Sequence, residues 1–134
     1  VSEIVIYNRS QKDWVQELNQ QLTCPITLKS LSDLESLKKD LQESYLLIQT
    51  TNVGMAPDED ECLIKDDTYL PEHLKVADII YHPQQTKLLK MAQKRGLDFM
   101  NGEGMILYQG AESFKFWTNQ EMPIEQVKKS LKME

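Results

Sequence analysis

Apolar residues follow two alternating patterns along the chain, short uninterrupted runs and longer segments with helical spacing. The short runs are rich in β-branched residues, which is typical of strands buried on both faces of a parallel sheet. They occupy residues 3–7, 26–28, 45–50, 76–81 and 97–100. Between the runs, apolar side chains recur three or four positions apart, as in Trp14, Leu18 and Leu22. This spacing predicts amphipathic helices between the strands.

The pattern predicts helices at residues 14–22, 34–41, 84–95, 104–117 and 124–133, with a single helical turn at 71–74. Ser10 is predicted to cap the first helix, and Ser30 or Ser32 the second. Gly96 stands where the end of a helix favours glycine. Because strands alternate with helices, the fold class is predicted to be α/β, with a mostly parallel sheet and helices on both faces.

Length and charge narrow the classes of protein that fit. One hundred and thirty-four residues predict one domain, residues 1–134, and 15 basic against 21 acidic residues give a net charge of −6. That balance argues against nucleic acid or an anionic membrane as a partner. No apolar run approaches the length of a membrane span and the start resembles no signal peptide, so we expect a cytoplasmic protein.

Metal and redox chemistry find little support in the sequence. Cys24 and Cys62 lie far apart without a zinc-binding pattern, and His73 and His82 are expected to be structural or at the surface. The acidic residues 58–61 and 66–67 lack the spacing of a calcium loop, which favours a solvated loop. No metal site is predicted.

Candidate binding residues lie where the predicted strands end, because ligands of open parallel sheets bind outside the carboxyl ends of the strands. Asn8, Arg9 and Ser10 follow the first strand. The Arg9 guanidinium suits a phosphate, Ser10 offers a hydroxyl, and the next helix offers free N–H groups. An exposed arginine in an ordinary polar turn explains the same residues, and both interpretations stay open from the tripeptide alone.

Glycine and methionine mark a second candidate segment, residues 101–105. Gly102 and Gly104 allow a backbone to approach a flat ring or a phosphate closely, although they also suit a plain turn. Met105 is placed within reach of a ligand ring, whereas the other large apolar side chains of helical spacing are mostly expected in the core. These are Met91, Met100, Phe114, Phe116 and Trp117. The six-residue glycine fingerprint of dinucleotide folds is absent from the sequence.

Taken together, four segments resemble the carboxyl-terminal half of shikimate dehydrogenase over nearly the whole chain. They are residues 8–10, residues 49–55, residues 78–83 with Thr86 and Leu89, and residues 101–111 continuing through Phe114, Trp117 and residues 122–123. The resemblance implies a Rossmann-like NADP-binding domain that lacks its first strand and glycine-rich loop, with the amino-terminal substrate domain absent. The chain also starts without Met on an apolar run, so we expect it to be part of a longer enzyme.

The resemblance assigns roles to particular residues. Those implied to bind the cofactor NADP are Asn8, Arg9, Ser10, Lys12, Thr51, Ile79, Gly102 and Met105. Tyr81 and Gln109 are implied to face the substrate, and no catalytic residue is expected in this chain. Asp13 stands where the family often has a basic residue, with Lys12 beside it. Gln49, Thr50 and Asn52 also depart from the family's Asn-Ala-Thr-Pro-Val-Gly-Met turn.

The activity implied is the NADPH-dependent reduction of 3-dehydroshikimate to shikimate, in aromatic amino acid biosynthesis. In this family a Lys–Asp pair from the amino-terminal domain handles the proton, so the isolated chain is expected to be inactive. A non-catalytic nucleotide-binding or regulatory module on the same scaffold is the alternative. Loss of the central strand predicts either direct pairing of the strands at 3–7 and 45–50, or self-association through unpaired sheet edges.

Overall fold

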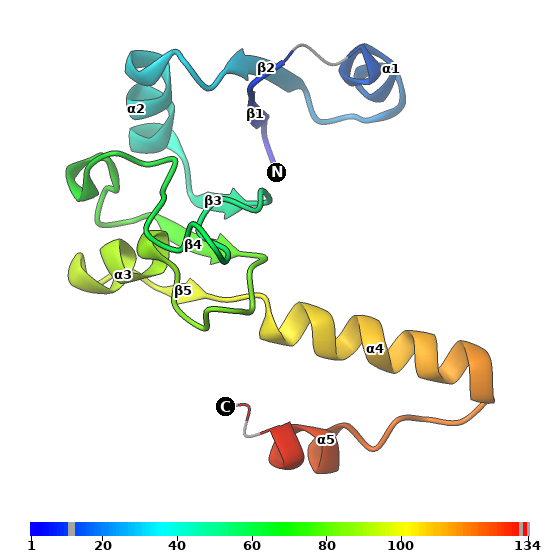
Figure 1. The fold of residues 1–134 in the computed structure, drawn as a ribbon. Helices are drawn as coiled ribbons and strands as arrows, with labels where there is room; N and C mark the ends of the chain where they lie inside the picture. The colour runs from blue at the N-terminus through cyan, green and yellow to red at the C-terminus, as the bar shows by residue number, and fades with distance from the viewer. Residues whose placement is uncertain (11–12, 132, 134) are drawn as a thin grey trace. The chain divides into compact units, whose positions relative to one another are not determined.

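The computed structural model describes residues 1–10, 13–131 and 133, and it divides the chain into two units, residues 1–44 and 45–134 (Figure 1). Its strands form two parallel sheets, one of two strands and one of three. The prediction of an α/β fold with parallel strands is confirmed. Among the described residues no strand pairing joins the two sheets, so the predicted direct pairing of residues 3–7 with 45–50 is wrong.

The first unit is a β-α-β motif followed by a helix. Strand β1 (Ile4–Asn8) pairs in parallel with β2 (Ile26–Ser30), and helix α1 (Trp14–Gln21) connects them. Asn19 of α1 secures the connection, because its side chain donates to the Ile26 carbonyl at 2.8 Å and accepts from the Ile26 N–H at 2.7 Å. The register pairs Asn8 with Ser30, which brings the polar ends of both strands together.

The predicted helix caps of this unit are wrong. Helix α1 begins after Asp13, which makes no side-chain cap, and Ser10 lies outside the helix. Helix α2 (Leu34–Glu43) is capped by Asp33, whose carboxylate accepts from the Ser36 N–H at 3.1 Å. Ser30 and Ser32 are hydrogen-bonded to each other at 2.8 Å, so their hydroxyls satisfy the end of the strand instead of the start of the helix.

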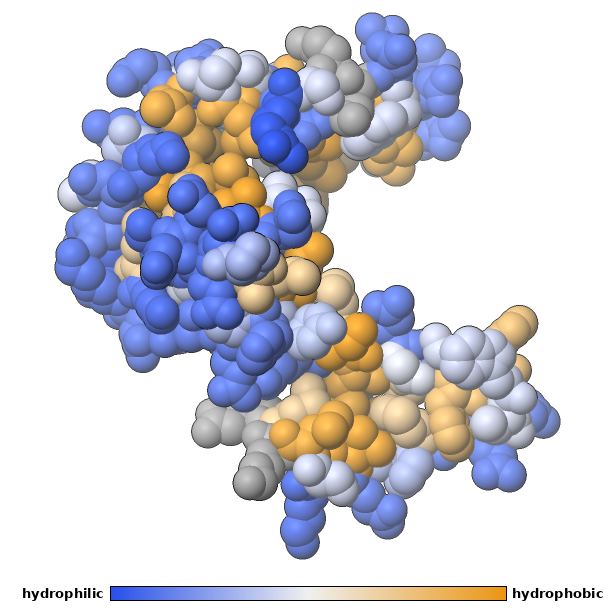
Figure 2. Space-filling model, viewed as in Figure 1, coloured by the Kyte–Doolittle hydropathy of each residue, from blue (hydrophilic) through white to orange (hydrophobic). Residues whose placement is uncertain are grey.

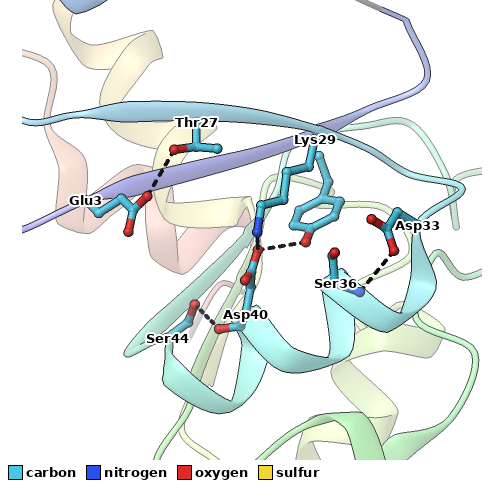
Figure 3. A network of polar contacts seen from close by, with 8 residues as sticks. Glu3, Thr27, Lys29, Asp33, Ser36, Asp40 and Ser44 are labelled. Carbon is cyan, nitrogen blue, oxygen red and sulfur yellow. Dashed lines mark hydrogen bonds and ion pairs between the residues drawn. The ribbon is translucent and has the colours of Figure 1, made fainter.

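A polar network ties both strands of this unit to α2 (Figure 3). The Asp40 carboxylate accepts from the Tyr7 hydroxyl and from the Lys29 ammonium, both at 2.7 Å. Burial raises the pKa of Asp40, but the hydrogen bonds from Lys29 and Tyr7 outweigh it and hold the pKa below its usual value. Burial and the bond to Asp40 raise the pKa of the Tyr7 phenol.

The second unit contains a three-stranded parallel sheet with the order β3-β4-β5. Its elements are β3 (Leu46–Gln49), the 3₁₀ turn η1 (Asp67–Tyr69), β4 (Lys75–Asp78), α3 (Lys87–Lys94), β5 (Phe99–Met100), α4 (Glu103–Thr118) and α5 (Ile124–Leu131). Helix α3 packs against β4 and β5. The core is aliphatic, since Leu70, Leu74, Val76 and Leu89 are at most 1% exposed. These apolar contacts supply most of the stability of the unit.

Two details of the second unit bear on the predictions. Gly96 follows α3 with φ +71°, so the prediction of a glycine at the end of this helix is confirmed. The predicted helical turn at 71–74 is a single hydrogen-bonded turn, in which the Leu74 N–H donates to the Pro71 carbonyl, and the 3₁₀ turn lies earlier, at Asp67–Tyr69.

Large apolar side chains are exposed over α4 and α5, as Figure 2 shows. Phe116 is 85% exposed, Trp117 79% and Met100 65%, so placing these three residues in the core is wrong. Of the described residues of α4, Leu107 alone is buried, which leaves the other faces of the helix open. None of the helices described is both long and apolar enough to cross a bilayer.

Candidate functional site

The first candidate site lies at the carboxyl end of β1, in the first unit. Asn8 orders the turn, because its side-chain amide donates to the backbone carbonyl of Ser10 at 3.1 Å. The backbone carbonyl of Asn8 accepts from the Leu31 N–H at 3.0 Å. Arg9 and Ser10 are exposed. In the part of the chain that the structure describes, no hydrogen bond or ion pair engages the Arg9 guanidinium. An exposed guanidinium of this kind can contact an anion from solvent.

Two neighbours complete the description of this turn. Lys12, predicted to assist with the phosphate, lies outside the described residues. Asp13 is exposed and its carboxylate caps no backbone N–H of α1. The end of β2 adds the hydroxyls of Ser30 and Ser32 to the same edge of the sheet, because the register pairs Ser30 with Asn8. This edge is therefore rich in hydrogen-bonding groups and carries the positive charge of Arg9.

The second candidate site is a pocket of about 360 Å³ in the second unit. Three segments form its walls: the loop after β3, the segment after β4 and the first turn of α4. The lining residues are Thr50, Thr51, Asn52, Met55, Ile79, Ile80, Tyr81 and Met105. Four residues singled out from the sequence, Thr51, Ile79, Tyr81 and Met105, are thus brought together by the fold. They come from positions up to 54 residues apart in the sequence, the difference between 51 and 105.

The pocket walls are mostly apolar, with hydroxyls and an amide at one side. Ile79, Ile80, Met55 and Met105 supply aliphatic and thioether surface. The phenol of Tyr81, which is 51% exposed, is the one ionisable side chain among the lining residues described. No group of three or more His, Cys, Asp or Glu side chains suited to a metal occurs in residues 1–10, 13–131 and 133. The walls suit a flat ring with a polar edge.

Gly102 lies behind this pocket, where the backbone of α4 meets the segment after β4. Its N–H donates to the Ile80 carbonyl at 2.9 Å, and a Cβ at this position would lie 1.9 Å from the Ile79 carbonyl oxygen. No side chain fits there. The close backbone approach predicted at Gly102 is therefore present, but it is made to residues 79 and 80, and Gly102 is not among the lining residues.

Gln109 belongs to the same face of α4 as Met105, one helical turn further along. It lines another pocket, of about 400 Å³, with Ile106, Phe114, Trp117 and Met122 among its neighbours. The structure consequently does not place Tyr81 and Gln109, the two predicted substrate-facing residues, in one pocket.

Asp78 and Thr86 hold the segment after β4, which forms one wall of the pocket of the second unit. Neither residue was assigned a role in binding or catalysis from the sequence. The Asp78 carboxylate, 2% exposed, accepts from the Ile80 N–H at 3.0 Å and from the Thr86 hydroxyl at 2.7 Å. Thr86 also caps α3 by accepting from the Leu89 N–H. A carboxylate inside an apolar run, eight residues before a threonine that caps a helix, is the signal that the sequence offers.

Gln49 likewise anchors the wall after β3. It is 8% exposed, and its side-chain amide is hydrogen-bonded to the backbone of Thr51 and Val53. The sequence marks Gln49 as a departure from the family pattern, and the structure shows which hydrogen bonds its side chain makes.

The chain is similar in sequence to shikimate dehydrogenases. Residues 102–132 match the family described as Shikimate 5'-dehydrogenase C-terminal domain. The NADP(+) shikimate dehydrogenase of Listeria monocytogenes serotype 4b is 37% identical over 98% of this chain, and that of Streptococcus pyogenes serotype M28 is 42% identical over 94%. These alignments cover 47% and 46% of the relatives, so the chain spans about half their length.

Solved structures agree with the sequence matches. A crystal structure of the Listeria monocytogenes enzyme in complex with shikimate and NAD superposes with a TM-score of 0.88 at 37% identity, covering 98% of this chain and 47% of that one. The shikimate dehydrogenase of Aquifex aeolicus gives 0.74 at 29% identity, covering 96% and 44%. A quinate dehydrogenase from Corynebacterium glutamicum, at 15% identity and 0.78, shares the fold. The Rossmann-like character of the chain is thereby confirmed.

Proposed function

We propose that this chain, homologous to the carboxyl-terminal part of shikimate dehydrogenases, supplies the nicotinamide-nucleotide side of an NADP-dependent shikimate dehydrogenase. The reaction is the reduction of 3-dehydroshikimate to shikimate in aromatic amino acid biosynthesis. The observation that carries the proposal is the pocket of the second unit, which gathers Thr51, Ile79, Tyr81 and Met105 from three separate segments.

The turn after β1 is proposed to bind the adenosine 2′-phosphate. A planar guanidinium with no partner among the described residues is suited to bidentate contact with a phosphate. Asn8 shapes the turn through its bond to the Ser10 carbonyl, and Ser10 adds an exposed hydroxyl. Lys12 stays a predicted contributor of positive charge. This site accounts for a preference for NADP over NAD, because only NADP carries the 2′-phosphate.

The pocket of the second unit is proposed to hold the nicotinamide ring. Ile79 and Met105 offer apolar surface to the faces of a ring, and Thr51 offers a hydroxyl at its edge. Gly102 contributes by permitting the contact between α4 and residues 79–80 that shapes this wall. Hydride transfer is the chemistry that the cofactor supplies, and the residues of this chain orient the ring.

Tyr81 and Gln109 are proposed to face the substrate, 3-dehydroshikimate or shikimate. A phenol and an amide each hydrogen-bond a polyhydroxylated ring carboxylate. The lining residues hold no lysine, histidine or carboxylate to move a proton, so we propose that the 134-residue chain by itself does not oxidise shikimate. The same pocket also suits a non-catalytic nucleotide-binding module. Adding a separately expressed amino-terminal half of a relative distinguishes the two proposals, because shikimate oxidation by the mixture favours the enzyme and its absence favours the module.

Self-association is proposed at the open edge of the three-stranded sheet. Strand β3 lies at this edge, and its side chains Leu46 and Ile48 are 47% and 54% exposed. An apolar edge strand is a template for pairing with another chain. Sedimentation should find Ile48→Lys more monomeric than wild type, and equal masses would remove the edge from the proposal. A cytoplasmic location stays a prediction.

Titration of the full chain with NADP⁺ and NAD⁺ by calorimetry tests the cofactor assignment. Arg9→Ala is expected to weaken NADP⁺ binding about tenfold, the effect of roughly 1.4 kcal/mol for a lost charged hydrogen bond, and to leave NAD⁺ binding nearly unchanged. Arg95→Ala, at the C-cap that follows α3, is a control for loss of an arginine charge outside the turn after β1. Equal losses for both nucleotides would remove Arg9 from the 2′-phosphate site.

A further inference from the structure

Gln49 is the last residue of β3 and carries a buried side-chain amide. Both N–H groups of this amide donate hydrogen bonds, and its oxygen accepts one. The side-chain nitrogen donates to the Thr51 carbonyl at 3.2 Å and to the Val53 carbonyl at 3.1 Å, and the side-chain oxygen accepts from the Thr51 N–H at 2.5 Å. Its backbone carbonyl meanwhile accepts from the Ile79 N–H at 3.1 Å. One residue therefore holds the loop after β3 and the segment after β4.

The loop that Gln49 holds is a wall of the proposed nicotinamide pocket. Thr50, Thr51 and Asn52 line the pocket directly. Among the described residues, the other hydrogen bonds within this loop run from the Val53 N–H to the Thr51 hydroxyl at 3.2 Å and from the Met55 N–H to the Asn52 carbonyl at 3.1 Å. Without the Gln49 amide, three backbone groups of the loop would need other partners, which costs about 1–3 kcal/mol for each group left buried and unpaired.

We infer that Gln49 is a positioning residue for nicotinamide-nucleotide binding, which fixes the loop after β3 in the shape that the ring requires. The inference rests on the proposed function. Asparagine, the residue of the family pattern, is shorter by one methylene, about 1.5 Å. It keeps the bond from the Thr51 N–H, which is a common turn contact of asparagine. From the same backbone position it does not reach the Val53 carbonyl, so this loop is built for glutamine.

Two substitutions separate positioning from general stability. Gln49→Met keeps the size of the side chain and removes all three hydrogen bonds, and Gln49→Asn keeps the shortest one. Gln93→Met is a matched control, because Gln93 lies exposed on α3 and is not a lining residue. Amide hydrogen exchange reports the loop at Thr51 and the core at Leu89, and calorimetry gives the Kd for NADP⁺.

Faster exchange at Thr51 with unchanged exchange at Leu89 is expected in Gln49→Met, whereas Gln49→Asn keeps the bond from the Thr51 N–H and should exchange there at close to the wild-type rate. The Kd for NADP⁺ should rise about tenfold in Gln49→Met, less in Gln49→Asn, and not in Gln93→Met. Unchanged exchange at Thr51 in Gln49→Met, or equal Kd values in wild type and both variants, would overturn the inference, and if Gln49→Met does not fold, the Kd of Gln49→Asn for NADP⁺ decides. Absence of NADP⁺ binding by the wild type is a different result, which refutes the proposed function.

Discussion

Gly102→Ala perturbs the contact between α4 and the pocket wall at a single atom. The backbone of Gly102 has φ −79° and ψ 0°, which alanine adopts without strain, so the added methyl group acts through space alone. That methyl would lie 1.9 Å from the Ile79 carbonyl oxygen and 2.4 Å from the Ile79 carbonyl carbon. Both are backbone atoms, so the segment after β4 or the start of α4 must move.

The magnitude follows from two effects. Overpacking of this kind costs about 1–3 kcal/mol. Movement that breaks the bond from the Gly102 N–H to the Ile80 carbonyl adds about 0.5–1.5 kcal/mol, for a total of roughly 2–4 kcal/mol. Gly104→Ala is the matched control, because a Cβ there meets nothing within 4 Å and alanine favours a helix over glycine by up to about 1 kcal/mol.

Urea unfolding followed by circular dichroism measures both variants. Gly102→Ala is expected to lose roughly 2–4 kcal/mol of unfolding free energy, and Gly104→Ala to be neutral or slightly stabilised. If Gly102→Ala stays within about 0.5 kcal/mol of wild type, as an ordinary surface substitution does, the argument from close approach is refuted.

Two further substitutions test the polar groups that organise each unit. Thr86→Val keeps the shape of the side chain but removes a donor from the buried Asp78 carboxylate and the cap of α3, so it should lower the unfolding free energy by about 2–4 kcal/mol, whereas Thr86→Ser should lose much less in the same urea experiment. Asp40 has a folded-state pKa below the usual value of 3.8, because the opposing effect of burial is outweighed by the hydrogen bonds from Lys29 and Tyr7 together with the nearby positive charge. The contribution of Asp40 to the free energy of unfolding is therefore present above about pH 4 and is lost as the pH falls through the lower folded-state pKa. Asp40→Asn should flatten the fall in stability below pH 4, and an unchanged acid limb would contradict the assignment.

The parallel strands and most helices were predictable because their signal is local. Uninterrupted β-branched runs and three-to-four spacing depend on short stretches of sequence, and the strand exits follow from the rule for parallel sheets. The convergence of Thr51, Ile79, Tyr81 and Met105 on one pocket needed the resemblance as well as the pattern.

The N-caps of α1 and α2 were not predictable from local pattern, nor was the exposure of residues on α4. A serine between a strand and a helix can hydrogen-bond at the end of the strand or cap the helix. Only the three-dimensional structure shows that Ser30 and Ser32 bond to each other at the end of the strand. Phe116 and Trp117 have helical spacing, but spacing does not tell whether anything packs on that face. The role of Gly102 was visible as a need for close approach, yet its partner, the Ile79 carbonyl, lies 23 positions earlier in the sequence, the difference between 102 and 79.

The central claim is that the pocket of the second unit binds the nicotinamide end of the cofactor. Nitrogen-15 NMR spectra of the full chain, recorded during titration with NADP⁺, test it most directly. We predict saturable shifts of the backbone amides of Thr51, Ile79 and Met105, which line the pocket, with the amides of Leu89 and Ala92 in the core unmoved. Saturable binding that leaves the three pocket amides unshifted, or no binding at all, would contradict the claim.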